Sequence, residues 1–179
     1  MSNSRDQALI ERCKRGDRRA LEQLLGDYER PVYNVAYRIV GNPDDAADVT
    51  QAVFLKTFEQ LDQYKPEFKF FSWIYRIAIN EAINQIKRNA NHVSLDDREI
   101  SDTRSPDDFV GAEDISRSIQ ESLMELREDY RTVVVLRHFS ECSYRQISEI
   151  LHIPEKTVKS RLYSARQLMK EKLKGSGIF

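Results

Sequence analysis

The amino-acid sequence predicts an all-α protein of two small helical domains, residues 1–90 and 113–179, joined by a flexible acidic linker at residues 91–112. Apolar residues recur at three- and four-residue spacing along most of the chain, which is typical of helices that bury one stripe. Most of the six glycines fall where such helices should end. Over residues 89–112 the periodicity stops, and six acidic residues outnumber two basic ones, which predicts the linker.

The composition excludes several classes of protein. With 40% apolar and 32% charged residues in 179, the chain is neither collagen, nor a disulfide scaffold, nor wholly disordered. Its 28 basic and 29 acidic residues also exclude a uniformly basic coat, so any binding of nucleic acid must use local patches. No apolar run approaches the roughly 20 residues of a membrane span, and the N-terminus lacks the features of a secretory signal. We therefore expect a cytoplasmic protein.

Four helices are predicted in the N-terminal domain. Asp17 is a good N-cap for the first, and Pro31 is expected to open the second, which Gly41 ends. Asn42 should cap a third helix that runs to about Leu61. A fourth is expected over residues 72–88, after an irregular loop.

The C-terminal domain is predicted to contain a helix-turn-helix. Ile115, Ile119, Leu123 and Leu126 form one amphipathic stripe, and residues 133–136 lie in a second packing helix. The sequence from Ser143 to Gln146 has the form of a capping box, and it opens a short helix that residues 152–154 break. A basic last helix follows this tight break, which is the arrangement of a helix-turn-helix.

The last helix presents a polar, basic face. Val158, Leu162, Ala165 and Met169 define its buried stripe, so the remaining positions face outward or flank that face. Residues 142–179 hold eight basic and three acidic residues, a net charge of +5. Cations that contact phosphates and short polar side chains that reach base edges suit the major groove. The alternative is an ordinary solvated basic helix.

A second surface combines aromatic and basic residues. In residues 64–71 aromatic side chains alternate with lysines, and a polar stripe of Trp73, Arg76, Asn80, Asn84 and Lys87 follows on the fourth helix. Rings that stack on unpaired bases and lysines that follow phosphates would suit DNA that has left the duplex. The alternative is that the aromatic run belongs to the core.

The third helix carries a mixed surface that suits a protein partner. Asp45, Asp48, Ala52 and Leu55 share one face with Gln51 beside it, and an ordinary solvated face is the alternative. The opposite positions are expected to supply the core; they are Val49, Val53, Phe58 and Leu61.

No catalytic or metal-binding motif is visible. The three histidines are scattered, and Cys13 and Cys142 lie far apart without a neighbouring ligand motif. The common nucleotide-binding and hydrolase motifs are missing as well. We therefore expect a protein that is not an enzyme and that needs no metal or cofactor.

A series of short motifs resembles the extracytoplasmic-function (ECF) sigma factors, a compact sigma-70 class that keeps only the second and fourth conserved domains. The resemblance covers nearly the whole chain. The motifs, in order, are Gly16-Asp17 with Ala20; Tyr33, Ala36-Tyr37-Arg38 and Gly41-Asn42; Asp45-Ala46 and Asp48-Val49-Thr50-Gln51 before Val53-Phe54; residues 71–78 with Asn80; and Ser143-Tyr144 through Ile153-Pro154 to Thr157-Val158-Lys159-Ser160-Arg161.

This resemblance implies a function and a set of sites. The protein would bring RNA polymerase core enzyme to promoters in a stress or envelope response and would melt the DNA there. An anti-sigma factor, which in this family can be membrane-anchored, would hold it inactive. The implied polymerase contacts are Asp45, Asp48, Gln51 and Leu55; the implied -10 contacts are Tyr64, Lys65, Phe68, Lys69, Phe70, Trp73, Arg76, Asn80 and Asn84; and the implied -35 contacts are Lys156, Thr157, Lys159, Ser160, Arg161, Tyr163, Ser164 and Arg166. The acidic linker would thread through the polymerase channels.

Two positions depart from the family pattern. Ala52 stands where a glutamate is usual, which leaves Asp48 and Gln51 to carry more of the docking. Lys156 replaces a usual glycine, and we expect it to add a phosphate contact. One alternative is a stand-alone helix-turn-helix repressor, which leaves the aromatic loop and the face of the third helix unexplained. The other is an enzyme with an unrecognised site, for which no pocket-type cluster of titratable residues is visible.

Overall fold

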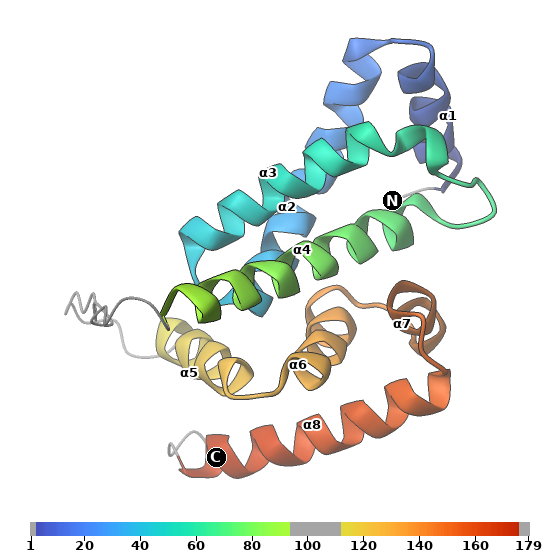
Figure 1. Cartoon of the computed structure of the whole chain (residues 1–179). Helices are drawn as coiled ribbons and strands as arrows, with labels where there is room; N and C mark the ends of the chain where they lie inside the picture. The colour runs from blue at the N-terminus through green and yellow to red at the C-terminus, as the bar shows by residue number, and fades with distance from the viewer. Residues whose placement is uncertain (1–2, 94–111, 176–179) are drawn as a thin grey trace.

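The computed structural model describes residues 3–93 and 112–175, and this part of the chain is helical almost throughout (Figure 1). The predicted linker lies almost wholly outside these residues. The helices are α1 (Asn3–Lys14), α2 (Arg18–Val40), α3 (Pro43–Glu59), the 3-10 turn η1 (Leu61–Gln63), α4 (Phe70–Val93), α5 (Ala112–Met124), α6 (Glu128–Val134), the π-helical turn η2 (Val135–Phe139), α7 (Tyr144–Leu151) and α8 (Glu155–Gly175).

Local capping signals fix several helix ends where the sequence predicts them. The Asp17 carboxylate accepts hydrogen bonds from the backbone N–H groups of Arg19 and Ala20, at 3.0 and 3.2 Å. Asn42 caps α3 in the same way, and Gly41 ends α2 in the left-handed conformation at φ 80°. The capping box of Ser143 at the start of α7 is also present.

The prediction that Pro31 opens a new helix is wrong. Pro31 lies inside α2, which continues unbroken from Arg18 to Val40. A proline in a helix interior removes one backbone hydrogen bond. Here the turns on both sides are held by burial, because Tyr28, Val32 and Val35 on the same helix lie in the core.

An additional helix, α1, packs against α2 and has no counterpart in the sequence prediction. Its Leu9 and Ile10 are buried, and the buried Asp6 carboxylate accepts a hydrogen bond from the Tyr28 hydroxyl at 2.7 Å. Periodicity did not predict this helix, because Leu9 and Ile10 lie among polar residues and form no apolar stripe.

The ends of α3 and α4 also differ from the prediction. Helix α3 stops at Glu59, and Leu61 is buried by the 3-10 turn that follows. Helix α4 begins at Phe70 rather than near residue 72 and continues to Val93. The buried Phe70 ring contacts Tyr28 edge to face, with ring centroids 5.2 Å apart, which anchors this helix start in the core.

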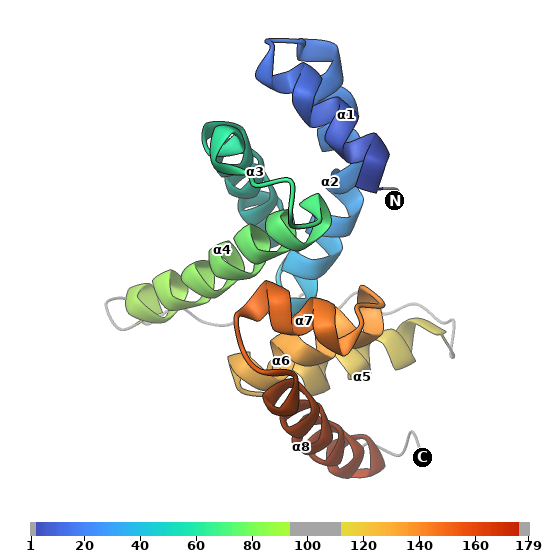
Figure 2. The ribbon, with the colours of Figure 1, turned by 90° about the vertical axis from the view of Figure 1, so that its right-hand side faces the viewer.

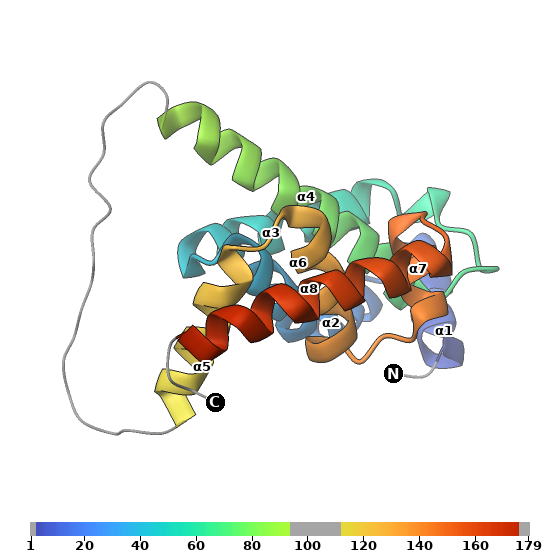
Figure 3. The ribbon, with the colours of Figure 1, turned by 90° about the horizontal axis from the view of Figure 1, so that it is seen from below.

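The C-terminal helices form a second lobe with α8 on its outer side. Val158, Leu162 and Ala165 are buried, as the helical wheel predicts, whereas Ile115 of the predicted α5 stripe is exposed. Seen from below, α8 lies across α5, α6 and α7 (Figure 3). Its opposite side is free of other helices in the part of the chain that the structure describes.

The two lobes, each of which is helical as predicted, pack against each other. Helix α2 contacts α5, α6 and η2, and α4 contacts α7 (Figures 1 and 2). Buried apolar side chains of both lobes belong to one continuous cluster. Periodicity identifies the buried stripe of each helix, but it does not say which stripes from distant segments meet.

Gly41 sits at this junction, and its replacement should destabilise the fold. We expect Gly41→Ala to lower the free energy of unfolding by about 1–2 kcal/mol, because an L-residue is strained in the left-handed conformation. The added Cβ would also meet Met124 Sδ of α5 at 2.6 Å. Gly16→Ala is the control, since Gly16 shares the positive φ but nothing lies within 4 Å. Urea unfolding measures both; equal stability of Gly41→Ala and the unaltered chain would contradict the expectation.

Candidate nucleic-acid interface

The outer face of α8 is exposed, polar and basic. Lys156, Lys159, Ser160 and Arg166 are exposed, and Tyr163 retains 67% of its surface. Thr157 and Ser164 lie at the edges of the face and are half-buried. An α-helix fits into the major groove of DNA, and the hydrogen-bond donors on this face could reach base edges there.

Two arginines of α8 that the sequence predicts to contact DNA interact with side chains of neighbouring helices. The Arg161 guanidinium lies 3.5 Å from the carboxylate of Asp129 in α6. Arg166 Nη2 lies 3.3 Å from His138 Nε2. Burial, and after it the charges of Arg166 and Arg137, lowers the pKa of His138, so its ring is neutral at neutral pH and can accept a hydrogen bond from Arg166. Both contacts fix the rotation of α8 on its lobe.

The aromatic residues around the start of α4 are mostly buried, which differs from the prediction that they stack on bases. Tyr64 and Phe70 are only 3% and 0% exposed. Trp73, which the sequence places in the polar stripe of this helix, packs against both rings, with ring centroids 5.5 and 5.6 Å away, and is partly buried. The spacing of apolar residues along one helix could not predict this burial, because it depends on a contact between Phe70 and Tyr28 of α2.

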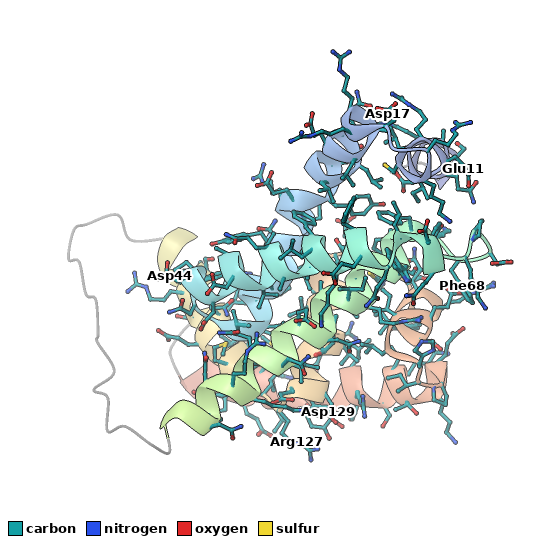
Figure 4. The ribbon with its side chains drawn as sticks, turned by 45° about the horizontal axis from the view of Figure 1, so that its top comes forward. Glu11, Asp17, Asp44, Phe68, Arg127 and Asp129 are labelled. Atoms are coloured by element: carbon teal, nitrogen blue, oxygen red, sulfur yellow. The ribbon has the colours of Figure 1, made fainter. Side chains whose placement is uncertain are left out.

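The residues between these rings remain exposed. The Tyr64 hydroxyl donates to the Phe68 carbonyl at 2.6 Å and so closes the loop, which brings Phe68 to its outer edge (Figure 4). Phe68 is 51% exposed, and Lys65 and Lys69 are exposed beside it. An exposed ring between two cations keeps the chemistry that stacking on a base requires.

Only part of the predicted polar stripe of α4 is accessible. Asn80 and Asn84 are exposed and line a groove that α4 forms with Lys56 of α3. Arg76 is turned instead toward the other lobe, where Nε donates to the Ile150 carbonyl at 3.2 Å and Nη2 to the Glu149 carbonyl at 2.7 Å. Burial lowers the pKa of Arg76 accordingly.

The predicted protein-binding face of α3 is largely exposed. Asp48 and Gln51 are exposed, and Leu55 retains 65% of its surface. Phe58, predicted to lie in the core, is 62% exposed and extends this stripe by one turn. Its position three residues after Leu55 was the signal that could have placed it there.

Asp45 has a different environment from the rest of this face. Its two carboxylate oxygens accept hydrogen bonds from Gln85 Nε2 at 2.7 Å and from Asn89 Nδ2 at 2.9 Å. Both donors belong to α4, so Asp45 joins α3 to α4 and is half-buried. A second tie is the Lys56 to Glu81 ion pair, at 2.5 Å.

The structure offers few groups for other chemistry. Among the described residues no three His, Cys, Asp or Glu side chains lie together as metal ligands would. Burial raises the pKa of Cys142 to about 12, which makes its thiol a poor nucleophile. No helix in the described ranges is long and apolar enough to cross a bilayer.

Comparison with known families and proteins accounts for both lobes. Residues 24–92 match Sigma-70 region 2, and residues 116–169 match Sigma-70 region 4. The chain is 32% identical to the ECF RNA polymerase sigma factor SigW of Bacillus subtilis, over 92% of this chain and 95% of that protein. The chain belongs to the ECF RNA polymerase sigma factors. An isolated helix-turn-helix repressor would not produce the match to region 2.

Further proteins similar to this ECF sigma factor also cover most of its length. The RNA polymerase sigma-H factor of Pseudomonas aeruginosa is 31% identical over 97% of this chain and 96% of that protein. The solved structure of CnrH in complex with the cytosolic domain of CnrY has the same fold, with a TM-score of 0.74 and 23% identity over 96% of this chain and 98% of that one. A sigma factor RpoE of Bartonella quintana, solved with the anti-sigma factor NepR, follows at 0.72 and 24% identity over 86% and 96% of the two chains.

Proposed function

We propose that this sigma factor docks on RNA polymerase through α3, reads the -35 element through α8 and opens the -10 element through the loop before α4. One observation carries this assignment. The exposed acidic and apolar stripe of α3 and the exposed basic face of α8 lie on helices at opposite sides of the molecule (Figures 1 and 2). A protein partner and duplex DNA can therefore be bound at once.

The docking surface that we propose on α3 consists of Asp48, Gln51, Leu55 and Phe58. Leu55 and Phe58 supply the exposed apolar area that the centre of a protein interface needs. Asp48 and Gln51 supply charge and hydrogen bonds beside it. Asp45 supports this surface from behind, since both its oxygens are used within the fold.

The -10 contacts that we propose are narrower than the sequence prediction. Phe68 would stack on an unpaired base while Lys65 and Lys69 contact phosphates. Asn80 and Asn84 are exposed on α4 and can hydrogen-bond to bases that leave the duplex. Tyr64, Phe70 and Trp73 form the aromatic support behind the loop.

The -35 contacts that we propose all lie on the outer face of α8. Lysines and Arg166 would contact phosphates, and the hydroxyl side chains would reach base edges. Arg161 would serve mainly to hold α8 through Asp129. The contacting residues are Lys156, Thr157, Lys159, Ser160, Tyr163, Ser164 and Arg166.

This assignment includes a place of action and a class of partner. We propose that the protein acts in the cytoplasm and catalyses no covalent chemistry itself. Residues 1–90 and 113–179 would form its two functional domains. Two proteins of the same fold were solved as complexes, CnrH with the cytosolic domain of CnrY and RpoE with the anti-sigma factor NepR. An anti-sigma factor is accordingly the proposed regulator.

Run-off transcription from a randomised promoter library tests the function. Purified sigma factor and bacterial core polymerase should together give transcripts that neither gives alone, and the selected promoters should share paired -35 and -10 sequences. Transcripts with no shared sequence, or a duplex site bound tightly by the chain without polymerase, would reject the proposal.

The proposed phosphate contact of Lys156 makes a separate prediction. Each phosphate that a protein neutralises adds about 0.9 to the slope of log affinity against log salt concentration. Lys156→Ala should reduce that slope by about 0.9 for binding of the holoenzyme to a selected promoter. The control is Lys174→Ala, a change of the same kind in the last turn of α8. If the two variants had equal slopes, Lys156 would not contact a phosphate.

A further inference from the structure

We infer that Tyr144 is a positioning residue for promoter recognition, because its ring orients the Lys159 side chain on the outer face of α8. Tyr144 is the first residue of α7 and precedes α8 by one helix and one tight turn. This role rests on the proposed function, which assigns Lys159 to the -35 element. Tyr144 itself need not touch DNA.

Two cations from different elements approach the Tyr144 ring. Lys159 Nζ of α8 lies 5.8 Å from the ring centre, and the Arg137 guanidinium of η2 lies 5.3 Å from it. An aromatic ring attracts a cation that lies within about 6 Å of its centre, because the faces of the ring carry negative partial charge. The ring therefore brings together two like charges that would otherwise repel each other.

Hydrogen bonds at the start of α7 fix the position of this ring. The Ser143 hydroxyl accepts from the Gln146 backbone N–H at 3.2 Å, and the Gln146 side chain accepts from the Ser143 N–H at 2.8 Å. Arg137 Nη1 donates to the Cys142 carbonyl at 2.9 Å, two residues before the tyrosine. The tyrosine side chain is also partly buried against the core. Ring and arginine are thus held by the fold, whereas the lysine is exposed and takes its orientation from the ring.

Orienting Lys159 in advance lowers the entropy cost of binding DNA. A long, flexible side chain loses conformational freedom when its ammonium group settles on a phosphate. Contact with the ring removes part of that freedom before the DNA arrives. Arg161 is held in the same way by Asp129, and Arg166 is held by His138. Three cations of α8 are thus oriented by side chains of other elements.

Nuclear magnetic resonance of the free full-length chain tests the contact without polymerase or DNA. In protein with isotope-labelled lysine, the ε-methylene protons of Lys159 should resonate upfield of those of Lys156, because a ring current shields protons above a ring. This difference should vanish in Tyr144→Leu and persist in Tyr144→Phe. A Lys159 signal that stays unshifted in the unaltered chain, or that Tyr144→Leu leaves in place, would overturn the contact.

A double-mutant cycle in the holoenzyme tests the consequence for promoter binding. Tyr144→Leu should weaken binding to a selected promoter about fivefold, whereas Tyr144→Phe, which keeps the ring, should bind like the unaltered chain. In a chain that already carries Lys159→Ala, Tyr144→Leu should cause no further loss. Tyr130→Leu is the matched control and should bind normally, since Tyr130 is also partly buried and lies 5.9 Å from the Arg127 guanidinium, outside α8.

The cycle separates a failure of this role from a failure of the proposed function. If Lys159→Ala left promoter binding unchanged, the assignment of Lys159 to the -35 element would be wrong, and its positioning by Tyr144 would fall with it. If Lys159→Ala weakened binding while Tyr144→Leu did not, the -35 assignment would stand and the role of Tyr144 would be overturned. Losses that simply added in the double variant would overturn that role as well, since Tyr144 would then act independently of Lys159.

Discussion

Asp48→Arg should reduce run-off transcription about a hundredfold, because it reverses a charge beside the apolar centre of the proposed docking surface. Asp48 is exposed on α3 next to Gln51 and the apolar pair Leu55 and Phe58. A surface substitution of this kind changes stability by no more than about 0.5 kcal/mol. The loss should therefore appear in the affinity for core polymerase, measured by fluorescence anisotropy of the labelled sigma factor.

The matched control for this experiment is Glu29→Arg, which makes the same charge reversal on an exposed position of α2. It should transcribe like the unaltered sigma factor. Phe58→Ala should weaken polymerase binding about tenfold, because it removes exposed apolar area from the same stripe. If Asp48→Arg bound core polymerase as tightly as Glu29→Arg, α3 would not be the docking surface.

Arg131→Met should cost about 3–5 kcal/mol of unfolding free energy, the largest stability effect that we expect from one substitution in this protein. Arg131 is 6% exposed and donates to four backbone carbonyls. Methionine fills much of the space but leaves those carbonyls buried without donors. Urea unfolding followed by circular dichroism gives the difference.

Arg127→Met is the control for this loss of charge. Arg127 lies just before α6, and its guanidinium is exposed, 3.6 Å from Asp129. An exposed ion pair contributes little, so this variant should lose no more than about 1 kcal/mol. Equal midpoints and slopes for the two variants would show that the carbonyl contacts of Arg131 do not stabilise the fold.

Much of the local architecture could be predicted from the sequence, because the signals act over a few residues. Asp17, Asn42 and Ser143 cap helices through their own side chains, and Gly41 ends α2 because it adopts positive φ easily. The buried stripe of α8 follows from helical periodicity, which also predicts the outward face that we propose for the -35 element. The exposed acidic face of α3 was predictable for the same reason.

Other features were decided only by the tertiary structure. Several aromatic residues lie close together between Tyr64 and Phe70, so periodicity could not predict which rings would be buried. In the structure Tyr28 of α2 contacts Phe70, and Phe70 in turn contacts Tyr64. Pro31 stays helical because the core holds both sides of it. The roles of Arg76 and Arg131 depend on helix ends that are distant in sequence and become neighbours only when the lobes pack. A chain's own sequence determines caps and stripes through local energies, whereas the partners of a buried cation depend on long-range contacts.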